Sequence, residues 1–280
     1  MQDQPTTDPD RSTMDPDRST TDADGQRTDS GDSAVHARRS ALYGYVATAL
    51  EFPGDDALAD LRADPVQDAV ETAATELATA VDAGRGGDEA PGRALPERVR
   101  DLSAAVDAAT DDEVETAYNH LFGLPGDDGT YPVVPYEAHY ATTGDVNETQ
   151  RRVATIVGLL ERFDLEPHDE FDERQDHVAA LLELAQVLAA QRAVALDGGE
   201  ADAADTLAAA EATVLDEHLL GFVPALAHDV DDAIPGSERS NGERVYAAAA
   251  RLAAALVEWD ATAHPEPAAA TAGGSGGDRR

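Results

Sequence analysis

Residues 241–260 read NGERVYAAAARLAAALVEWD, and the apolar side chains of this stretch recur every three or four positions. That spacing places them on one face of an α-helix, because an α-helix has about 3.6 residues per turn. The face consists of Val245, Ala249, Leu252, Leu256 and Trp259. The stretch 66–81 repeats the pattern. Both stretches therefore predict amphipathic helices whose apolar faces lie in a core.

The same period continues through most of the chain, and prolines and glycines divide it into roughly nine helical segments. Alternating runs typical of β-strands are almost absent. We therefore predict an all-α fold, a single helical bundle at residues 33–262. The predicted helices are 34–50, 55–63, 65–83, 96–109, 111–123, 147–163, 173–196, 202–229 and 241–260.

Both ends of the chain differ from this pattern. Residues 1–32 are acidic and almost free of apolar side chains, and DPDRST occurs in them twice. Residues 263–280 end in a glycine-rich run. Such segments cannot bury enough apolar surface to offset the entropy lost on ordering. We therefore predict a disordered acidic N-terminal tail and a disordered C-terminal tail, with a surface loop at the Gly/Asp-rich stretch 84–92.

One long connection is rich in proline and tyrosine. Residues 124–145 read LPGDDGTYPVVPYEAHYATTGD, although the rest of the chain has few aromatic residues. Long loops in compact bundles are often functional. The alternative is a loop that only packs its own tyrosines against the bundle.

Composition excludes several classes of partner and site. The chain has 57 acidic and 20 basic residues, all of the latter arginine, and its net charge is −37. This surface repels nucleic acid and anionic lipid, and it is typical of halophilic proteins that stay soluble in concentrated salt. The absence of cysteine excludes disulfides, thiolate catalysis and cysteine-ligated metal centres.

Localisation follows from hydropathy. We see no apolar run long enough to span a bilayer, so no membrane insertion is expected. Arg38 and Arg39 lead into an amphipathic helix rather than into the apolar segment of an export signal. We therefore expect a cytoplasmic protein.

Motifs for catalysis are also missing. None of the eight histidines follows a glutamate at the spacing of a di-iron Glu-x-x-His pair, and without lysine there is no phosphate-binding P-loop. No Gly-x-Ser-x-Gly elbow occurs, although a Ser–His–Asp arrangement elsewhere stays possible. We predict a protein that is not an enzyme and that has no metal or other cofactor.

Three segments are similar to one known family. They read YNHLFGLP at 118–125 followed by PYEAHY at 135–140, ERQDHVAALLEL at 173–184, and EHLLGFVP at 217–224. In this order and spacing they resemble the TorD/DmsD family of redox-enzyme maturation chaperones, to which NarJ-type chaperones are related. Arg174 stands where the family usually has proline.

The resemblance implies an all-helical chaperone. Such a protein binds the twin-arginine signal peptide, the body, or both, of a molybdenum-cofactor oxidoreductase, and coordinates cofactor insertion with assembly and export. The implied partner is a molybdoenzyme catalytic subunit similar to dimethyl sulfoxide, trimethylamine oxide or nitrate reductase, bound by a monomer or homodimer. Two alternatives remain: a helical scaffold that binds only the mature apo-enzyme, and a metal- or nucleotide-handling enzyme with an unrecognised site.

The resemblance also implies a peptide site. Carboxylates pair with guanidinium groups in bidentate geometry, so Glu137 and Asp176 are suitable partners for two peptide arginines. Aromatic side chains would contact the apolar part of the peptide. The expected peptide-binding residues are Phe122, Pro135, Tyr136, Glu137, Tyr140, Asp176, His177, Glu183, His218 and Phe222.

Some of these residues also have structural interpretations. Asp176 and His177 open a predicted helix, where an acid can cap the first turn, and capping and peptide binding are equally compatible with this position. His218 and Phe222 are four positions apart on a predicted helix, where core packing is the favoured role.

Overall fold

The computed structural model describes residues 21–54, 56–82, 91–123, 131–141, 146–165 and 173–263, with side chains from Asp32 onward except those of 80–82 and 91. Within these ranges the chain is helical, and its only β-type contact is an isolated bridge between Tyr136 and His177. The predicted all-α class is confirmed. The helices are α1 (Thr21–Leu50), α2 (Ala57–Arg62), α3 (Asp64–Asp82), α4 (Leu95–Ala108), α5 (Asp111–Tyr118), α6 (Glu137–Ala141), α7 (Val146–Arg162), α8 (Val178–Asp197), α9 (Ala201–Thr213), α10 (Val223–Ala233) and α11 (Asn241–Ala263).

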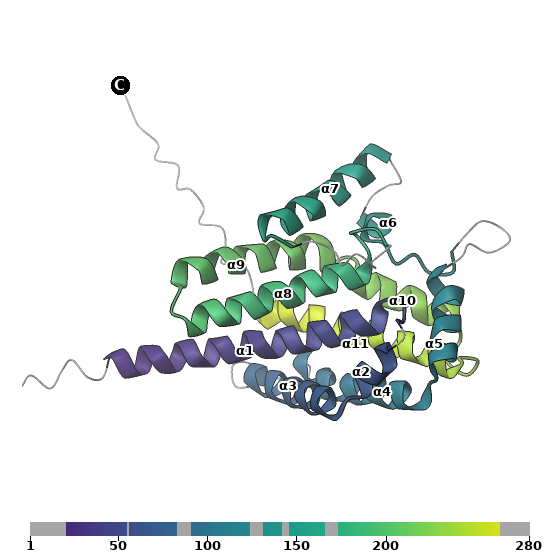
Figure 1. Ribbon diagram of the computed structural model, residues 1–280, viewed down its shortest axis with the longest axis horizontal. Helices are drawn as coiled ribbons and strands as arrows, with labels where there is room; N and C mark the ends of the chain where they lie inside the picture. The colour runs from purple at the N-terminus through teal and green to yellow at the C-terminus, as the bar shows by residue number, and fades with distance from the viewer. Residues whose placement is uncertain are drawn as a thin grey trace, which may run out of the picture.

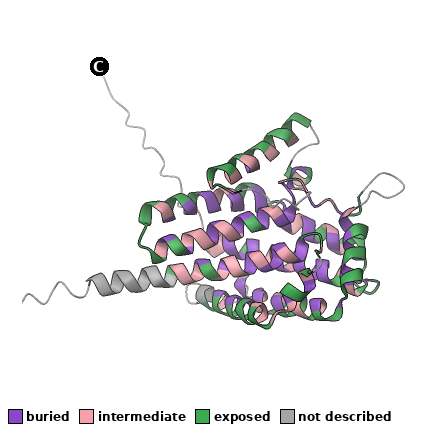
Figure 2. Cartoon of the chain, viewed as in Figure 1, coloured by how far each residue is buried: buried purple, intermediate pink, exposed green. Residues whose placement is uncertain are grey.

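Helix α11 is the centre of the bundle. It packs against α1, α4, α5 and α10, while α1 also packs along α8, and α8 along α9 (Figure 1). Helices α2, α3 and α4 lie on the far side of α1 from α8. Helix α7 lies outside these layers, next to α6, and its outer face is exposed (Figure 2).

The core consists of the predicted apolar faces. All five predicted core residues of α11 are at most 1% exposed, and in α3 the predicted face buries Val70, Ala73 and Leu77. Helix α8 is long and apolar enough to cross a membrane by length and composition alone, contrary to our expectation that no such run exists. More than half of its apolar window is buried inside the bundle, as in core helices of soluble proteins.

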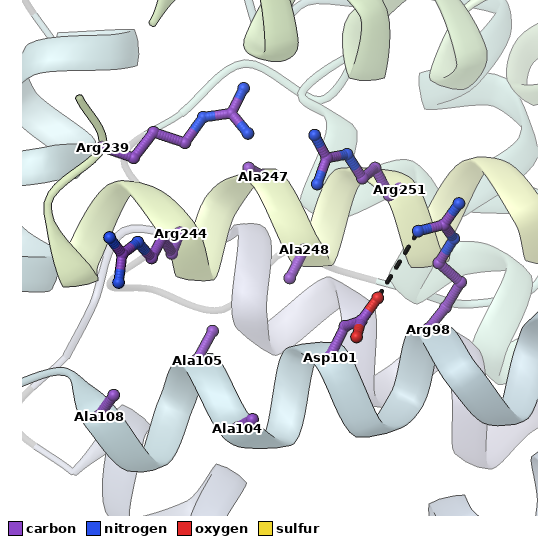
Figure 3. A pocket seen from close by; sticks show the side chains of 10 residues that line it. All are labelled: Arg98, Asp101, Ala104, Ala105, Ala108, Arg239, Arg244, Ala247, Ala248 and Arg251. Atoms are coloured by element: carbon purple, nitrogen blue, oxygen red, sulfur yellow. Dashed lines mark ion pairs between the residues drawn. The ribbon is translucent and has the colours of Figure 1, made fainter. Parts of the chain in front are cut away.

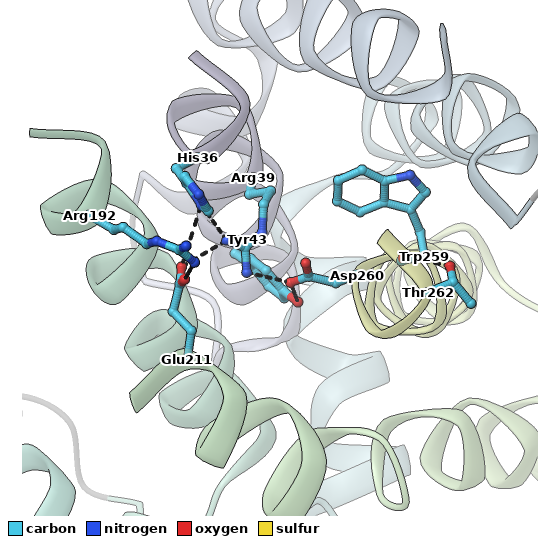
Figure 4. Close-up of polar contacts among 8 residues, drawn as sticks. All are labelled: His36, Arg39, Tyr43, Arg192, Glu211, Trp259, Asp260 and Thr262. Atoms are coloured by element: carbon cyan, nitrogen blue, oxygen red, sulfur yellow. Dashed lines mark hydrogen bonds and ion pairs between the residues drawn. The ribbon is translucent and has the colours of Figure 1, made fainter. Parts of the chain in front are cut away.

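A buried polar network joins α1, α8, α9 and α11 (Figure 4). The Arg39 guanidinium donates to Glu211 at 2.8 Å and to Asp260 at 2.7 Å, and Tyr43 donates to the same Asp260 oxygen at 2.8 Å. Arg192 donates to the other Glu211 oxygen at 2.6 Å. Because a buried charge is costly unless it is paired, these contacts fix how the four helices meet.

Several boundaries differ from the prediction. The predicted helix 202–229 is wrong as one element: α9 leads into a π-helical segment, Val214–Leu219, and a turn precedes α10. Pro224 explains the break, since it lies in the first turn of α10, where its missing N–H costs no hydrogen bond. Helix α1 begins at Thr21, so residues 21–32 extend it with a polar stretch that no apolar period reveals.

The Pro/Tyr-rich connection contains a helix that the sequence did not predict, α6. Helix α8 begins at Val178 rather than at 173, because residues 173–177 form a turn whose backbone pairs with the connection. Of the tails predicted at 1–32 and 263–280, residues 1–20 and 264–280 lie outside the described residues, as do residues 84–90 of the loop predicted at 84–92. The described parts are helical: residues 21–32 belong to α1, Ala263 ends α11, and Pro91 begins a short 3-10 helix, Pro91–Ala94.

Candidate functional site

Two of the three motif segments meet through their backbones. The Glu137 amide donates to the Asp176 carbonyl, and the Val178 amide donates to the Pro135 carbonyl, each at 2.9 Å. This antiparallel bridge joins the Pro/Tyr-rich connection to the N-terminus of α8. Residues about forty positions apart in sequence therefore form one compact site.

Glu137 is a buried carboxylate held by an arginine of the same chain. It is 1% exposed, and its Oε1 lies 2.6 Å from both Nε and Nη2 of Arg152 on α7. His218 Nδ1 is 3.4 Å from the same oxygen, within ion-pair distance but without hydrogen-bond alignment. The Arg152 guanidinium also donates to the Glu217 carbonyl. Oε2 of Glu137 has no hydrogen-bond partner among the described residues.

Asp176 repeats this arrangement. It is fully buried, and its Oδ2 accepts from Arg174 at 2.7 Å and from the Ala138 amide at 3.2 Å. The Arg174 guanidinium also lies over the Tyr136 ring, 4.6 Å from its centroid. Burial raises the pKa of Asp176, while the Ala138 amide and Arg174 oppose that rise. Within the described part of the chain, Oδ1 has no partner.

His177 caps α8, and the acid beside it, for which capping and peptide binding were equally compatible, does not. Its Nδ1 accepts from the Ala179 amide at 3.2 Å, so His177 is the N-cap of α8, whereas Asp176 caps the short helix α6 through Ala138. Burial lowers the pKa of His177 to about 4, against an opposing effect of Glu173. The imidazole is therefore neutral near neutral pH.

Aromatic side chains pack together beside the two motif segments. Tyr140 packs on Phe222 with ring centroids 5.1 Å apart, and its hydroxyl donates to Asp229 at 2.7 Å. Phe122 lies in a neighbouring cluster, 5.3 Å from the Tyr118 ring. Burial raises the pKa of Tyr140, and the hydrogen bond to Asp229 raises it further. The Tyr140 hydroxyl therefore stays neutral and acts as a hydrogen-bond donor.

The structure gathers most of the predicted site residues and separates one. Glu183 is exposed on α8 and is not among the residues in contact at the site. His218 and Phe222 are 1% and 2% exposed, which agrees with the core packing favoured for them. Phe122 lies in the adjoining aromatic cluster. The predicted residues that lie at or beside the site are Pro135, Tyr136, Glu137, Tyr140, Asp176, His177, His218 and Phe222.

Three important residues were not predicted. Arg152 pairs with Glu137 across a gap of fifteen positions and from a different helix, and local spacing holds no signal for that. Glu173 accepts from the hydroxyls of Tyr118 and Tyr136. Arg174 stands where the similar family usually has proline, and its guanidinium pairs with the acid two positions later, a spacing that the sequence does show.

A model of the nitrate reductase delta subunit family matches residues 63–228, which is more than half of the chain and includes every residue that the sequence predicts for the site. The chain belongs to the nitrate reductase delta subunit family. No curated protein matches the chain in a search of its sequence. Membership in the delta subunit family supports a role as a maturation chaperone of a molybdoenzyme.

The site of this delta subunit family member offers paired carboxylates rather than metal ligands. Within the described ranges no group of three or more His, Asp or Glu side chains is placed to hold a metal ion. The chemistry available is recognition of cations: two buried acids, each with one oxygen on an arginine and one oxygen unpaired among the described residues, close in sequence to the half-buried Tyr136 and Tyr140.

Proposed function

We propose that this chaperone binds the twin-arginine signal peptide of a molybdoenzyme catalytic subunit at Glu137 and Asp176. The observation that carries the proposal is that each of these buried carboxylates already holds a guanidinium, from Arg152 and Arg174 respectively. Two adjacent sites that accept arginine match the chemistry of two adjacent arginines.

Binding would proceed by exchange of arginines. The side chains of Arg152 and Arg174 are 29% and 47% exposed, so water can solvate them on release. If a peptide arginine enters as each leaves, the buried carboxylate stays paired throughout. That matters because an unpaired buried charge costs about 3–5 kcal/mol.

Helix α7 is suited to such an exchange. It buries one side chain fully, Ile156, and packs mainly beside α6 at the edge of the bundle. Elements with few buried contacts move at low free-energy cost. Movement of α7 would withdraw Arg152 and open the ring edges of Tyr140 and Tyr136 to the apolar part of the peptide.

The exchange is tested by removing the internal competitor. Arg152→Gln should tighten binding of a synthetic twin-arginine peptide by about tenfold, because a site occupied by its own arginine in most molecules binds with reduced apparent affinity. Arg151→Gln is the matched control, since Arg151 is exposed on the same helix and removes the same charge. Affinity would be measured by fluorescence anisotropy in dilute and in concentrated salt.

Further peptides and a second variant keep the test decisive. The double variant Glu137→Gln with Arg152→Gln carries no buried charge at this position, so it should fold. Its preference for Arg-Arg over Ala-Ala peptides should fall to what Asp176 alone provides. Equal affinities for Arg-Arg and Ala-Ala peptides in the unmodified protein would refute the proposal and favour a scaffold for the mature enzyme.

The cellular location of the protein follows from the same proposal. A signal peptide is accessible to a chaperone before export, so we place the protein in the cytoplasm. The excess of acidic over basic residues suits concentrated salt, where long-range repulsion is screened and short-range bidentate pairs persist.

A further inference from the structure

A second site lies on the opposite side of the bundle from α6 and α7. A cavity of about 420 Å³ opens between α4 and α11, and Figure 1 shows α4 at the far edge of the bundle from α7. Its floor consists of alanines, which keep the two helices free of bulky side chains there (Figure 3). The lining residues are Arg98, Asp101, Ala104, Ala105, Ala108, Arg239, Arg244, Ala247, Ala248 and Arg251.

The charge of this lining is the reverse of that of the chain. Four arginines and one aspartate line the cavity, whereas the whole chain has 57 acidic and 20 basic residues. One fifth of all the basic residues of the protein therefore meet in one pocket. On a surface that repels anions elsewhere, this pocket is a local site of attraction for them.

Two of the arginines are fixed in position by an acid outside the lining. Asp231 Oδ1 lies 2.9 Å from Arg239 and 2.7 Å from Arg251. The other two are more available: Arg98 faces Asp101 at a long 3.6 Å, and Arg244 is exposed with no ion pair among the described residues. Two arginines are thus preorganised and two can take a ligand.

The arginines are spread along the cavity rather than converging on one point. Figure 3 shows Arg244 at one end and Arg98 at the other, with the heads of Arg239 and Arg251 on the same side of α11. The lining runs from Arg98 to Ala108 on α4, about 15 Å along a helix, which an extended peptide covers with about four residues. A single small anion would contact only part of this length.

We propose that the pocket binds an acidic segment of a partner protein, about four residues long in extended form and carrying carboxylates at both ends. The alanine floor lets its backbone approach closely, and guanidinium forks receive its carboxylates in bidentate geometry. This site is separate from the Glu137 and Asp176 site, and it stands whether or not a signal peptide binds there.

The test uses a labelled synthetic peptide of alternating Asp and Ala, with an Asn and Ala peptide as control, titrated with the full chain in dilute and in concentrated salt. The variant is Arg98→Gln with Arg244→Gln, which disturbs no buried contact. The matched control is Arg100→Gln with Arg151→Gln, since both of these arginines are exposed and lie outside the pocket.

The unmodified protein and the matched control should bind the Asp peptide and not the Asn peptide. The pocket variant should bind the Asp peptide at least about tenfold more weakly, as expected for the loss of a charge-assisted pair at each end of the segment. Equal weakening in both variants would overturn the proposal, because net charge alone would then explain it. Binding of inorganic phosphate without binding of the peptide would also overturn it, in favour of a small anion. Self-association abolished by the pocket variant would assign the pocket to a second copy of the chain and overturn the proposed partner.

Discussion

His177 should make the stability of the protein depend on pH in a way that one substitution removes. The imidazole is fully buried at the N-terminus of α8. Its Nδ1 accepts a hydrogen bond from the Ala179 amide, and its Nε2 lies 3.3 Å from the Tyr118 hydroxyl oxygen. Burial lowers the pKa of His177 from 6.5 to about 4, with Glu173 opposing that change. The folded state therefore holds the neutral form, and protonation favours unfolding.

The sign and size of this pH dependence follow from the linkage between proton binding and folding. Below pH 6.5 the unfolded chain takes up a proton that the folded chain refuses until about pH 4, so the free energy of unfolding falls as pH falls through this window. The full effect of a shift from 6.5 to about 4 is on the order of 3 kcal/mol, and about 2 kcal/mol of it is lost between about pH 7 and about pH 5.

The assay is denaturant unfolding of the unmodified protein and of His177→Asn at several pH values in this range. Asparagine also accepts at an N-cap position, so the variant keeps the cap and loses the titrating group. The carboxylates contribute equally to the pH dependence of both proteins, so they cancel when the two free energies of unfolding are subtracted. The free energy of unfolding of the unmodified protein minus that of His177→Asn should fall by about 2 kcal/mol as pH falls from about 7 to about 5. Parallel curves would refute a lowered pKa of His177 and with it the buried, neutral assignment.

Two other changes test the packing. Asp260→Asn should lower the free energy of unfolding by about 3–5 kcal/mol, because it removes one of the two carboxylates that neutralise the buried Arg39 guanidinium. Asp101→Asn, the same change in an exposed pair, should change it by no more than about 1 kcal/mol. Similar losses of unfolding free energy in the two variants, measured by chemical denaturation, would contradict the assignment of a buried network around Arg39. Gly242→Ala should be destabilising by about 1–3 kcal/mol, because its Cβ would overlap the backbone carbonyl of Glu113, while Gly158→Ala, in an open and exposed helical position, should stabilise by about 0.5–1 kcal/mol. Thermal unfolding of both variants measures this, and a stable Gly242→Ala protein would show that α5 and α11 can separate without cost.

The helices could be predicted because their cores follow a simple period. The face of α11 was correct in every residue, since a helix buried along its length must repeat apolar side chains at helical spacing. The break before α10 was missed although Pro224 marks it, because the apolar period continues across the turn. Helix α6 has five residues, too few for any period to appear.

The site was predictable in its acids and aromatic residues and not in its arginines. Motif segments name Glu137 and Asp176 because these residue types recur at fixed spacing in the similar family. Their burial and their pairing are long-range facts, set by how α7 and the turn before α8 pack. Sequence spacing holds no information about which of the arginines reaches which buried carboxylate.

The exposure of the arginine distinguishes the two kinds of buried ion pair in this protein. Arg39 is 4% exposed and contacts both Glu211 and Asp260, so releasing it would remove a buried guanidinium from two buried carboxylates at once. Arg152 and Arg174 also neutralise buried carboxylates, yet both reach water. An incoming arginine can therefore replace them while the buried carboxylate stays paired, because the released guanidinium is already partly solvated. This difference explains why peptide exchange is proposed at Glu137 and Asp176, and why the network around Arg39, which has the same chemistry, can only be structural.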